Sequence, residues 1–461
     1  MKKRVSTKIL SVLTVASLAL VSNVHAFDLL QAWEMASEHD PQQAMSKASV
    51  KSAQALQEQA QALWKPIVFA NATTGLASST SLATGAQFSA PGFGRSTGVE
   101  FGTSVNQGVT HRWALNAKQA VYDVAKRAQQ NQLNSSAKAS ELNATWLEQQ
   151  LALITIERYF NVMLAQSKHA LIHQQLEAVH RSWVEAKDRY EIGDAPVTDV
   201  YEASSRAKAL QAQLNSAQTE LQMTRLILAD SMGVDVDTVS VKSLKATPFA
   251  ISLDSLSQVL TQAQDHNLSL QLRALEVDSA KQEAIKFTHA ASPVVELIAA
   301  VSKEQLHGQG DFGASNNSQS QKMLGLSLSL PLYTAGSRDG KFKESLASSD
   351  KRVAEYDVSH AQLLQAIKST WMNLKSAPER VLAYDEALMA SAARRDATRT
   401  GKQVGDKTTL ELLSAENDLL QAHVSALQAR LEALYNQAKL DVLRGRLTPD
   451  TFKKINNALA P

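Results

Sequence analysis

The chain of 461 residues contains no cysteine, and that absence removes several kinds of chemistry at once. Disulfides, thiolate metal sites and cysteine nucleophiles are excluded, and so is a lipid anchor on a cysteine that follows a signal sequence. Aromatic residues form only 5% of the chain, which is low for large globular cores. With 47 basic and 45 acidic residues the chain is close to neutral, which argues against a nucleic-acid partner.

The sequence also lacks a recognisable catalytic motif. It has no glycine-rich phosphate loop, no nucleophile elbow and no paired-carboxylate motif. His169 and His173 lie four residues apart and would share a helix face, but no carboxylate between them completes a metal-ligand set. Their polar neighbours indicate a solvated face instead. We therefore expect no enzyme activity, no cofactor and no metal site.

A long apolar run is missing everywhere except near the N-terminus. Four basic residues precede the apolar segment Ile9–Val21, which is followed by Val24-His25-Ala26. This order is typical of a secretory signal peptide, and thirteen residues are too few for a membrane span of about 20. We predict that residues 1–26 are a signal peptide and that the mature protein begins at Phe27. An uncleaved membrane anchor is the alternative.

What the sequence does contain is an internal repeat. Ile192-Gly193-Asp194 returns as Val404-Gly405-Asp406, an offset of 405 − 193 = 212 positions that continues into the flanking helices without a gap. An earlier stretch repeats at a second offset, with Pro66 returning as Pro293 (293 − 66 = 227). Such a repeat predicts one supersecondary unit used twice in a pseudo-symmetric body. The alternative is a chance likeness among Ala/Leu/Gln-rich helices.

Most of the chain has helical periodicity. Apolar residues recur every seven positions from Val200 onward, with small and large side chains alternating, which is typical of coiled-coil packing. The matching helix of the second unit carries two such seams, one through Leu412 and Leu419 and the other through Leu420 and Leu427. A helix with two seams must pack against neighbours on two sides, as in a cylinder of helices. A single antiparallel bundle with a thick core is the alternative.

Four short segments alternate with period two instead. In Thr97–Val109, Val105 and Val109 are predicted to share an apolar face, and in Met323–Leu332 leucines face one way while glycine and serines face the other. Each has an upstream partner that starts at a proline, where a strand tolerates one. These partners are Pro66–Leu76 and Pro293–Leu306.

The stretches between the paired strands, Ser78–Gly94 and His307–Ser320, are rich in Gly, Ser, Asn and Gln and are predicted to be exposed hairpin loops. The repeat therefore predicts two units, at residues 27–235 and 236–447, and a C-terminal tail at 448–461. Each unit has a first helix, a β-hairpin and two long helices. The hairpins are expected at about 66–109 and 293–333, and the long helices at about 112–190, 197–231, 340–402 and 409–443.

Strands of about ten residues, apolar on one face and small or polar on the other, suit a membrane better than a soluble core. A soluble hairpin domain is the rival interpretation. Two hairpins supply four strands, whereas the smallest membrane barrels have about eight. A lipid-exposed sheet edge leaves backbone groups unpaired, so the membrane interpretation requires several chains to share one barrel.

The order of helix, hairpin, long helix, glycine turn and helix, given twice, resembles the TolC family of bacterial outer-membrane efflux channels. The likeness covers essentially the whole mature chain, and its most specific parts are the doubled glycine turn, the proline-led strands and Leu330-Pro331-Leu332-Tyr333. It implies a mainly α homotrimer with a membrane β-barrel portion, in which a shared twelve-stranded barrel continues into a periplasmic cylinder of helices. It also implies a passive exit duct in the outer membrane of a Gram-negative bacterium.

The resemblance assigns roles to residues at the two glycine turns. It implies that the turns close the periplasmic end through polar links at Thr198, Asp199, Lys402 and Lys407, with Lys402 in place of the tyrosine often found there. Asp199 lies in the first turn of a helix, where capping is the simpler interpretation. The resemblance also implies an acidic ring of Glu411 at the narrowest point, where the second acidic site is Ser414 here. The implied adaptor-docking residues are Gly193, Asp194, Gly405 and Asp406.

The partners that the resemblance implies are two further copies of the chain, a periplasmic adaptor, an inner-membrane pump and outer-membrane lipid. The alternative is a soluble periplasmic adaptor or coiled-coil scaffold. Adaptors usually have an inner-membrane helix or a lipidated cysteine, and the predicted mature chain has neither. The uninterrupted leucine face of Leu324–Leu332 also favours lipid over water.

Overall fold

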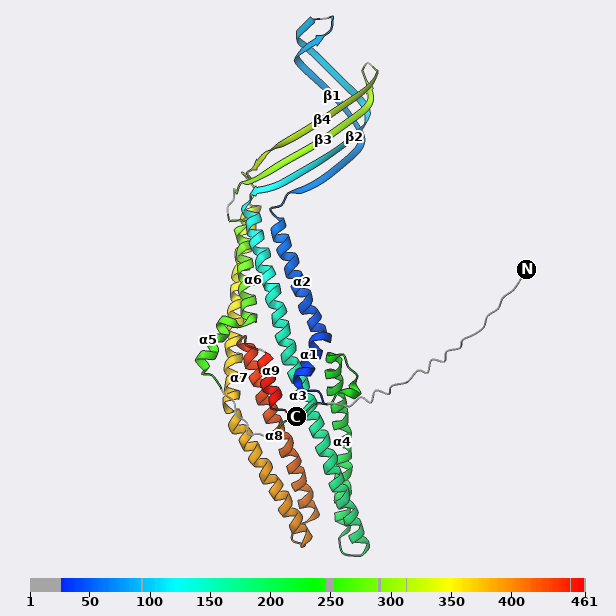
Figure 1. Ribbon diagram of the computed structural model, residues 1–461, viewed down its shortest axis with the longest axis vertical. Helices are drawn as coiled ribbons and strands as arrows, with labels where there is room; N and C mark the ends of the chain where they lie inside the picture. The colour runs from blue at the N-terminus through cyan, green and yellow to red at the C-terminus, as the bar shows by residue number, and fades with distance from the viewer. Residues whose placement is uncertain are drawn as a thin grey trace, which may run out of the picture.

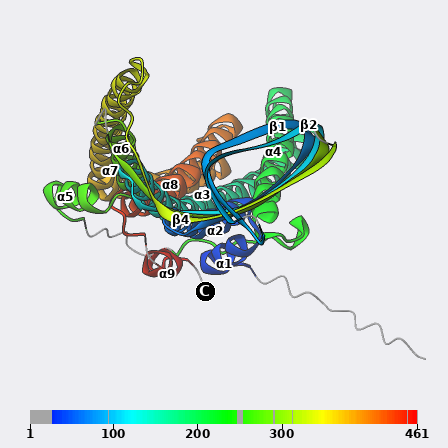
Figure 2. The same ribbon diagram turned by 90° about the horizontal axis from the view of Figure 1, so that it is seen from above.

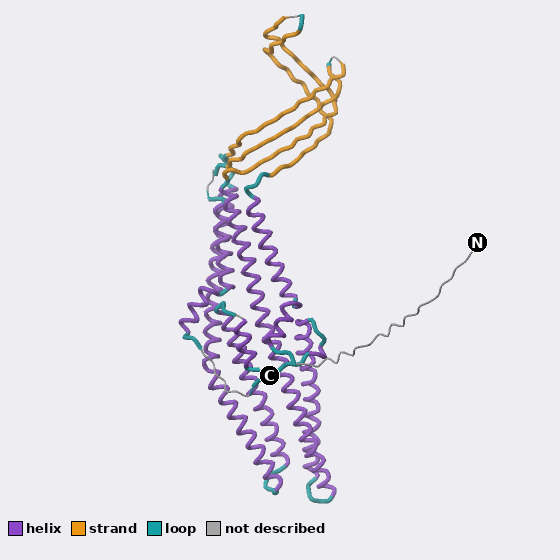
Figure 3. Tube along the Cα trace, in the orientation of Figure 1, coloured by secondary structure: helices purple, strands orange, loops and turns teal. Residues whose placement is uncertain are grey.

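The computed structural model describes residues 26–92, 94–245, 253–288, 292–311, 313–447 and 449–459. Apart from Ala26, the predicted signal peptide lies outside the described residues. Long helices fill one end of the molecule and a curved sheet extends from the other (Figure 1), and the helical and stranded portions occupy separate lengths of it (Figure 3). Among the described residues, no helix is both long and apolar enough to cross a membrane.

Each half of the chain builds the same series of elements. The first unit comprises α1 (Leu29–His39), α2 (Pro41–Ala62), β1 (Ile67–Ala90), β2 (Gly94–Tyr122), α3 (Val124–Glu191) and α4 (Val197–Met232). The second comprises α5 (Leu256–His266), α6 (Leu268–Ile285), β3 (Val294–Gly310), β4 (Gly313–Ser329), α7 (Ser337–Gln403) and α8 (Thr409–Leu443). A 3₁₀ turn, η1 (Val236–Thr238), follows the first unit, and α9 (Pro449–Asn457) follows the second.

The two units correspond in detail. α1 and α5 start 256 − 29 = 227 positions apart, and α4 and α8 start 409 − 197 = 212 positions apart. Tyr159 on α3 donates its hydroxyl proton to the carbonyl of Phe27 at 2.9 Å. Its counterpart Trp371 on α7 donates its indole N–H to the carbonyl of Asp254 at 3.0 Å. An aromatic donor therefore fastens the start of the short helix to the long helix in both units.

The first hairpin is longer than predicted. β2 continues to Tyr122, so α3 begins at Val124 and not near residue 112. The reason is the pairing of β2 with β3, which extends from Asn106 to Tyr122 and keeps these residues extended. Asp123 then begins the helix, because its carboxylate accepts the N–H of Lys126 at 3.1 Å.

The stretches predicted as hairpin loops are strands. β1 and β2 pair up to Ala90 and Gly94, and β3 and β4 pair up to Gly310 and Gly313, so the prediction for 78–94 and 307–320 was wrong. Small polar side chains do not prevent pairing when both backbones continue side by side. The four strands form one antiparallel sheet in the order β1-β2-β3-β4, which leaves β1 and β4 at the edges.

The prediction that Val105 and Val109 share a face was also wrong, because β2 carries a bulge between them. The pairing register shifts between Asn106 and Val109, and Gln107 has a φ of 52°. Val105 is therefore buried, at 2% exposure, whereas Val109 is 42% exposed. Beyond the bulge, the outer part of β1 and β2 leaves the line of the sheet and turns back across its concave side (Figure 2).

The register divides the side chains of the sheet into two faces. Paired residues on one face are mostly apolar across all four strands, as in the rows Val68–Ala117–Ala299–Leu324 and Ala70–Leu115–Val301–Lys322. We call this the apolar face. The opposite face, which we call the polar face, carries Asn71, Arg112, Asn116, Lys118, Glu296 and Glu304. Leu324, Leu326 and Leu328 on the apolar face are about 70% exposed, which in water would be costly.

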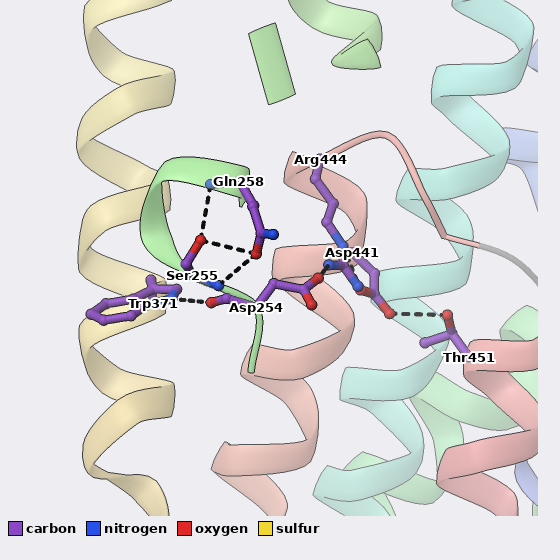
Figure 4. Close-up of polar contacts among 7 residues, drawn as sticks. All are labelled: Asp254, Ser255, Gln258, Trp371, Asp441, Arg444 and Thr451. Carbon is purple, nitrogen blue, oxygen red and sulfur yellow. Dashed lines mark hydrogen bonds and ion pairs between the residues drawn. The ribbon is translucent and has the colours of Figure 1, made fainter. Parts of the chain in front are cut away.

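Midway along the helices, α1, α5 and α9 form a waist around the long helices. The C-terminal tail forms α9 here, and Phe452 stacks on Trp33 of α1 at 5.0 Å between ring centroids. In the second unit the waist is held together by polar contacts (Figure 4). Arg444 donates to Asp254 at 2.7 Å and to Asp441 at 2.5 Å.

Asp441 links this polar cluster to α9. Its second carboxylate oxygen accepts the hydroxyl proton of Thr451 at 3.0 Å, and Asp441 and Thr451 are both buried (Figure 4). The carboxylate thus has partners on α8 and α9 at once. A buried charge without them would be strongly destabilising, so the end of α8 and the start of α9 are held in one arrangement.

Phe452 anchors α9 to the waist, because it is 1% exposed and stacks on Trp33. Phe452→Ala should weaken the docking of α9 by about 3–5 kcal/mol and release the helix to protease. Limited proteolysis followed by intact-mass measurement checks this, with exposed Lys454→Ala as the control. Equal cleavage rates after residue 449 in both variants would contradict the packing described here.

Candidate functional site

The two helix reversals lie together at the end of the molecule farthest from the sheet (Figure 1). At the first, Gly193 has a φ of 79°, a left-handed conformation that glycine adopts without strain. Its N–H donates to the carbonyl of Tyr190 at 2.9 Å, and the N–H of Asp194 donates to that of Arg189 at 2.8 Å. These two bonds form a Schellman motif, which ends α3 within one turn. Arg189 then pairs with the carboxylate of Asp194 at 2.9 Å.

The second reversal uses the same backbone. Gly405 has a φ of 82°, and its N–H donates to the carbonyl of Lys402 at 3.1 Å. The N–H of Asp406 donates to the carbonyl of Gly401 at 2.8 Å. The side chains differ, because Gly401 takes the position of Arg189 and Asp406 has no arginine partner there. Ile192 and Val404 stand at equivalent positions and are 80% and 76% exposed, so each tip presents an uncovered apolar residue.

The start of α8 is closed by a capping box. Thr408 accepts the N–H of Glu411 at 3.2 Å on its hydroxyl, and the carboxylate of Glu411 accepts the N–H of Thr408 at 2.8 Å. Lys407 also donates to Glu411 at 2.8 Å. The hydrogen bond from Lys407, aided by those from Thr408, lowers the pKa of Glu411 to about 2. Glu411 therefore keeps its negative charge at any pH above that value.

Two polar contacts join the first helical hairpin to the second near these tips. The hydroxyl of Thr409, the first residue of α8, donates to the carboxylate of Asp199 on α4 at 3.1 Å. The amine of Lys402 on α7 lies 3.6 Å from the carboxylate of Glu185 on α3. Its side chain is only 11% exposed, so this ion pair is shielded more than most surface pairs.

The predicted link residues are thus gathered at one end, but the chain does not pair Asp199 with Lys402 or Lys407. Asp199 contacts Thr409, Lys402 contacts Glu185 and Lys407 contacts Glu411. Thr198 is exposed. Asp199 lies in the first turn of α4, as predicted, where the helix dipole favours a carboxylate, but it makes no capping hydrogen bond and the N-cap of this helix is Pro196.

Sequence reasoning missed the partners of these residues. Thr408-x-x-Glu411 is a capping-box pattern and could have assigned Glu411 to the helix start. Thr409, Glu185 and the hydrogen-bonded pair Arg206 and Asn417 carry no local signal, because their contacts join helices far apart in the chain.

The two histidines considered as metal ligands lie on α3 with ring centroids 6.4 Å apart. His173 is 3.7 Å from Glu177, and both side chains are more than half exposed. Within the described ranges, no group of three or more His, Asp or Glu side chains is placed to hold a metal ion.

A sheet with an exposed apolar face, continuous with long helices that end in polar reversals, defines a membrane channel protein whose helices project away from the bilayer. The sequence model of the family described as outer membrane efflux protein matches residues 259–446. The chain is 24% identical over 375 residues to outer membrane protein TolC of Escherichia coli (strain K12), covering 79% of this chain and 75% of that protein. It is 24% identical over 306 residues to outer membrane efflux protein BepC of Brucella suis biovar 1, covering 66% and 65%.

The fold agrees with these sequence matches. The crystal structure of the outer membrane protein VceC from Vibrio cholerae superposes with a TM-score of 0.69 at 19% identity, over 90% of this chain and 96% of that one. The family-model match, the relatives and the solved structures all point to the TolC-like outer membrane efflux protein family. It is an outer-membrane efflux or secretion channel with a large periplasmic portion, and the alternative of a soluble periplasmic adaptor or scaffold has no support.

The contact of Lys407 with Glu411 predicts how the first turn of α8 responds to acid. Because the pKa of Glu411 is lowered to about 2, the ionised capping box persists below the ordinary value of 4.5 and is lost only as the pH falls towards 2. Lys407→Gln should return this pKa towards its ordinary value. The amide of Thr408, which donates to that carboxylate, should then lose protection from hydrogen exchange at about pH 3.5 in the variant and keep it in the wild type.

Lys402→Gln is the matched control, since Lys402 contacts Glu185 and not Glu411. Exchange is compared after correction for the intrinsic pH dependence of amides. The same protection profile in Lys407→Gln and wild type would show that Lys407 does not set the charge state of Glu411.

Proposed function

We propose that three copies of this chain close into one twelve-stranded barrel in the outer membrane and that their helices form a periplasmic duct below it. The observation that carries the proposal is the four-stranded sheet with an exposed apolar face and two unpaired edges, β1 and β4. Those edges need partners in lipid, and four strands are too few to close alone. Pairing β4 of one copy with β1 of the next satisfies every edge.

The polar face would then line the pore. It carries charges of both signs, and Arg112 lies 4.0 Å from Glu304 across β2 and β3. Such a lining interacts with water and tolerates solutes of different charge, which suits a passive exit duct for drugs or unfolded polypeptides. The energy for transport would come from an inner-membrane pump, coupled through a periplasmic adaptor.

The helical tips would close the periplasmic end at rest. Thr198, Asp199, Lys402 and Lys407 are the proposed latch, and the contacts Asp199–Thr409 and Lys402–Glu185 support a role in holding the two hairpins of one chain together. Exposed polar links contribute only about 0–1 kcal/mol each. Repeated by threefold symmetry, such links hold a closed state that a partner can still open.

Glu411 of each copy would form an acidic ring at the narrowest point. Lys407 lies 2.8 Å from its carboxylate, so the ring attracts cations less than three free carboxylates would. Gly193, Asp194, Gly405 and Asp406 are the proposed docking residues for the adaptor. The uncovered Ile192 and Val404 beside them support this, because exposed apolar residues at two equivalent tips offer matching contacts to a partner.

The trimer is tested by the native mass of the protein extracted from outer membranes in mild detergent. Three chains of 50.0 kDa, each without the predicted signal peptide, should give about 140 kDa after subtraction of detergent. A monomer released into the periplasmic fraction without detergent would contradict the shared barrel.

The latch is tested by single-channel conductance in planar bilayers. Asp199→Ala removes the acceptor of Thr409, and Lys407→Glu places a second carboxylate beside Glu411. Three broken links of about 0.5 kcal/mol each should raise the open population about tenfold in either variant.

Lys168→Ala is the control, because it breaks a close ion pair with Glu220, at 2.6 Å, that lies along the helices and away from the tips. If the resting conductance of either variant equals that of the control, the residue substituted in that variant is not part of the latch.

A further inference from the structure

Two lysines on the apolar face have no partner of opposite charge. Lys303 on β3 and Lys322 on β4 both belong to this face, since Lys303 pairs with Trp113 and Ser320, and Lys322 pairs with Val301. Ser320 lies two residues before Lys322, so the lysines are diagonal neighbours within reach of one ligand. Neither forms an ion pair with any described residue.

The lysines mark the outer limit of the apolar band. The rows that contain Leu324 and Lys322 are apolar on the other three strands, whereas the next row outward is Ala72–Trp113–Lys303–Ser320. Trp113 is 48% exposed at this step, as expected of an aromatic side chain at a membrane interface. The helices leave the sheet at the opposite end, so this limit lies at the outer leaflet (Figure 1).

Two adjoining hollows occur at this position. An apolar one of about 540 Å³ is lined by Leu115, Ala117, Val301 and Leu324, with Lys322 at its rim. A smaller one of about 280 Å³ has a lining that includes His111, Trp113, Lys303 and Gln305. The two hollows sit in successive rows of the sheet, with the apolar one nearer to the helices.

No carboxylate among the described residues forms an ion pair with these lysines. In the described rows of the apolar face, from Val295 to Gln305 on β3 and from Ser318 to Leu328 on β4, no residue is acidic. Arg112 and Glu304 pair with each other on the polar face. β1, which would lie beside β4 in a closed barrel, contains no charged residue in Ile67–Ala90, so a neighbouring copy cannot supply an acid from this strand.

We propose that Lys303 and Lys322 bind the phosphate group of an anionic lipid of the outer leaflet, while its acyl chain occupies the apolar hollow beside Leu115 and Leu324. Two like charges held as diagonal neighbours are unfavourable until an anion lies between them. An ammonium group near an anionic membrane surface gains about 1 kcal/mol. The proposal rests on the outer-membrane location of the sheet.

The test is native mass spectrometry of the full-length protein in a neutral detergent, titrated with didecanoyl phosphatidic acid or with phosphatidylcholine of the same chains. Lys303→Gln together with Lys322→Gln should weaken phosphatidic acid binding about thirtyfold and leave phosphatidylcholine binding unchanged. Arginine at both positions should retain binding. Lys118→Gln, on the polar face of β2, is the matched control and should behave as wild type.

Two results would overturn the proposal. Equal phosphatidic acid affinity in wild type and the double glutamine variant would show that the lysines do not bind the lipid. Full displacement of the lipid by millimolar inorganic phosphate would show that the apolar hollow takes no part. The oligomeric mass and conductance of the double variant should match those of wild type, so failure of the trimer is distinguishable from failure of this site.

Discussion

A peptide group in lipid has no water to bond with, and this constraint governs the sheet of this protein. Four antiparallel strands satisfy the backbone groups between them but leave those of β1 and β4 open. The long helices have no such need, because their hydrogen bonds lie within each helix. In the proposed shared barrel these edges would pair with other copies of the chain, whereas the helical part depends on small side chains that let helices approach closely.

The small side chains are visible in the helical core. Ala203, Ala217, Ala433 and Ala438 are all nearly inaccessible to solvent on α4 and α8. Larger apolar residues concentrate at the waist, where Tyr159, Ile156 and Phe452 share one cluster. This distribution accounts for a low aromatic content in a chain with an extensive interior. The chain holds long, narrow contacts between helices and one thick core where short helices wrap around them.

The internal repeat made the architecture predictable from the sequence. Gly193 and Gly405 marked both reversals, and alternation in Met323–Leu332 marked a strand with a lipid-suited face. The length of the strands could not be predicted from the sequence, because the serine and glycine residues in 78–94 suit loops and paired strands equally well. The bulge at Gln107 has no composition signal, and it moved Val105 to the other face. At the tips, the positions were predictable, but the partners were not. Asp199 reaches Thr409 across 210 positions of sequence, and no local pattern encodes such a contact.

The equal lengths of the two helical hairpins have a consequence for how this molecule can change. α3 and α7 have 68 and 67 residues, and α4 and α8 have 36 and 35. At 1.5 Å per residue, α4 and α8 set the distance from waist to tip at about 50 Å. A deletion in one helical hairpin alone would leave its tip short of the tip of the other hairpin. It would also shift the heptad register of its apolar seams relative to the neighbouring helices. Lengthening or shortening therefore requires matched changes of whole heptads in all four long helices, so the reach of the tips can change only in large steps.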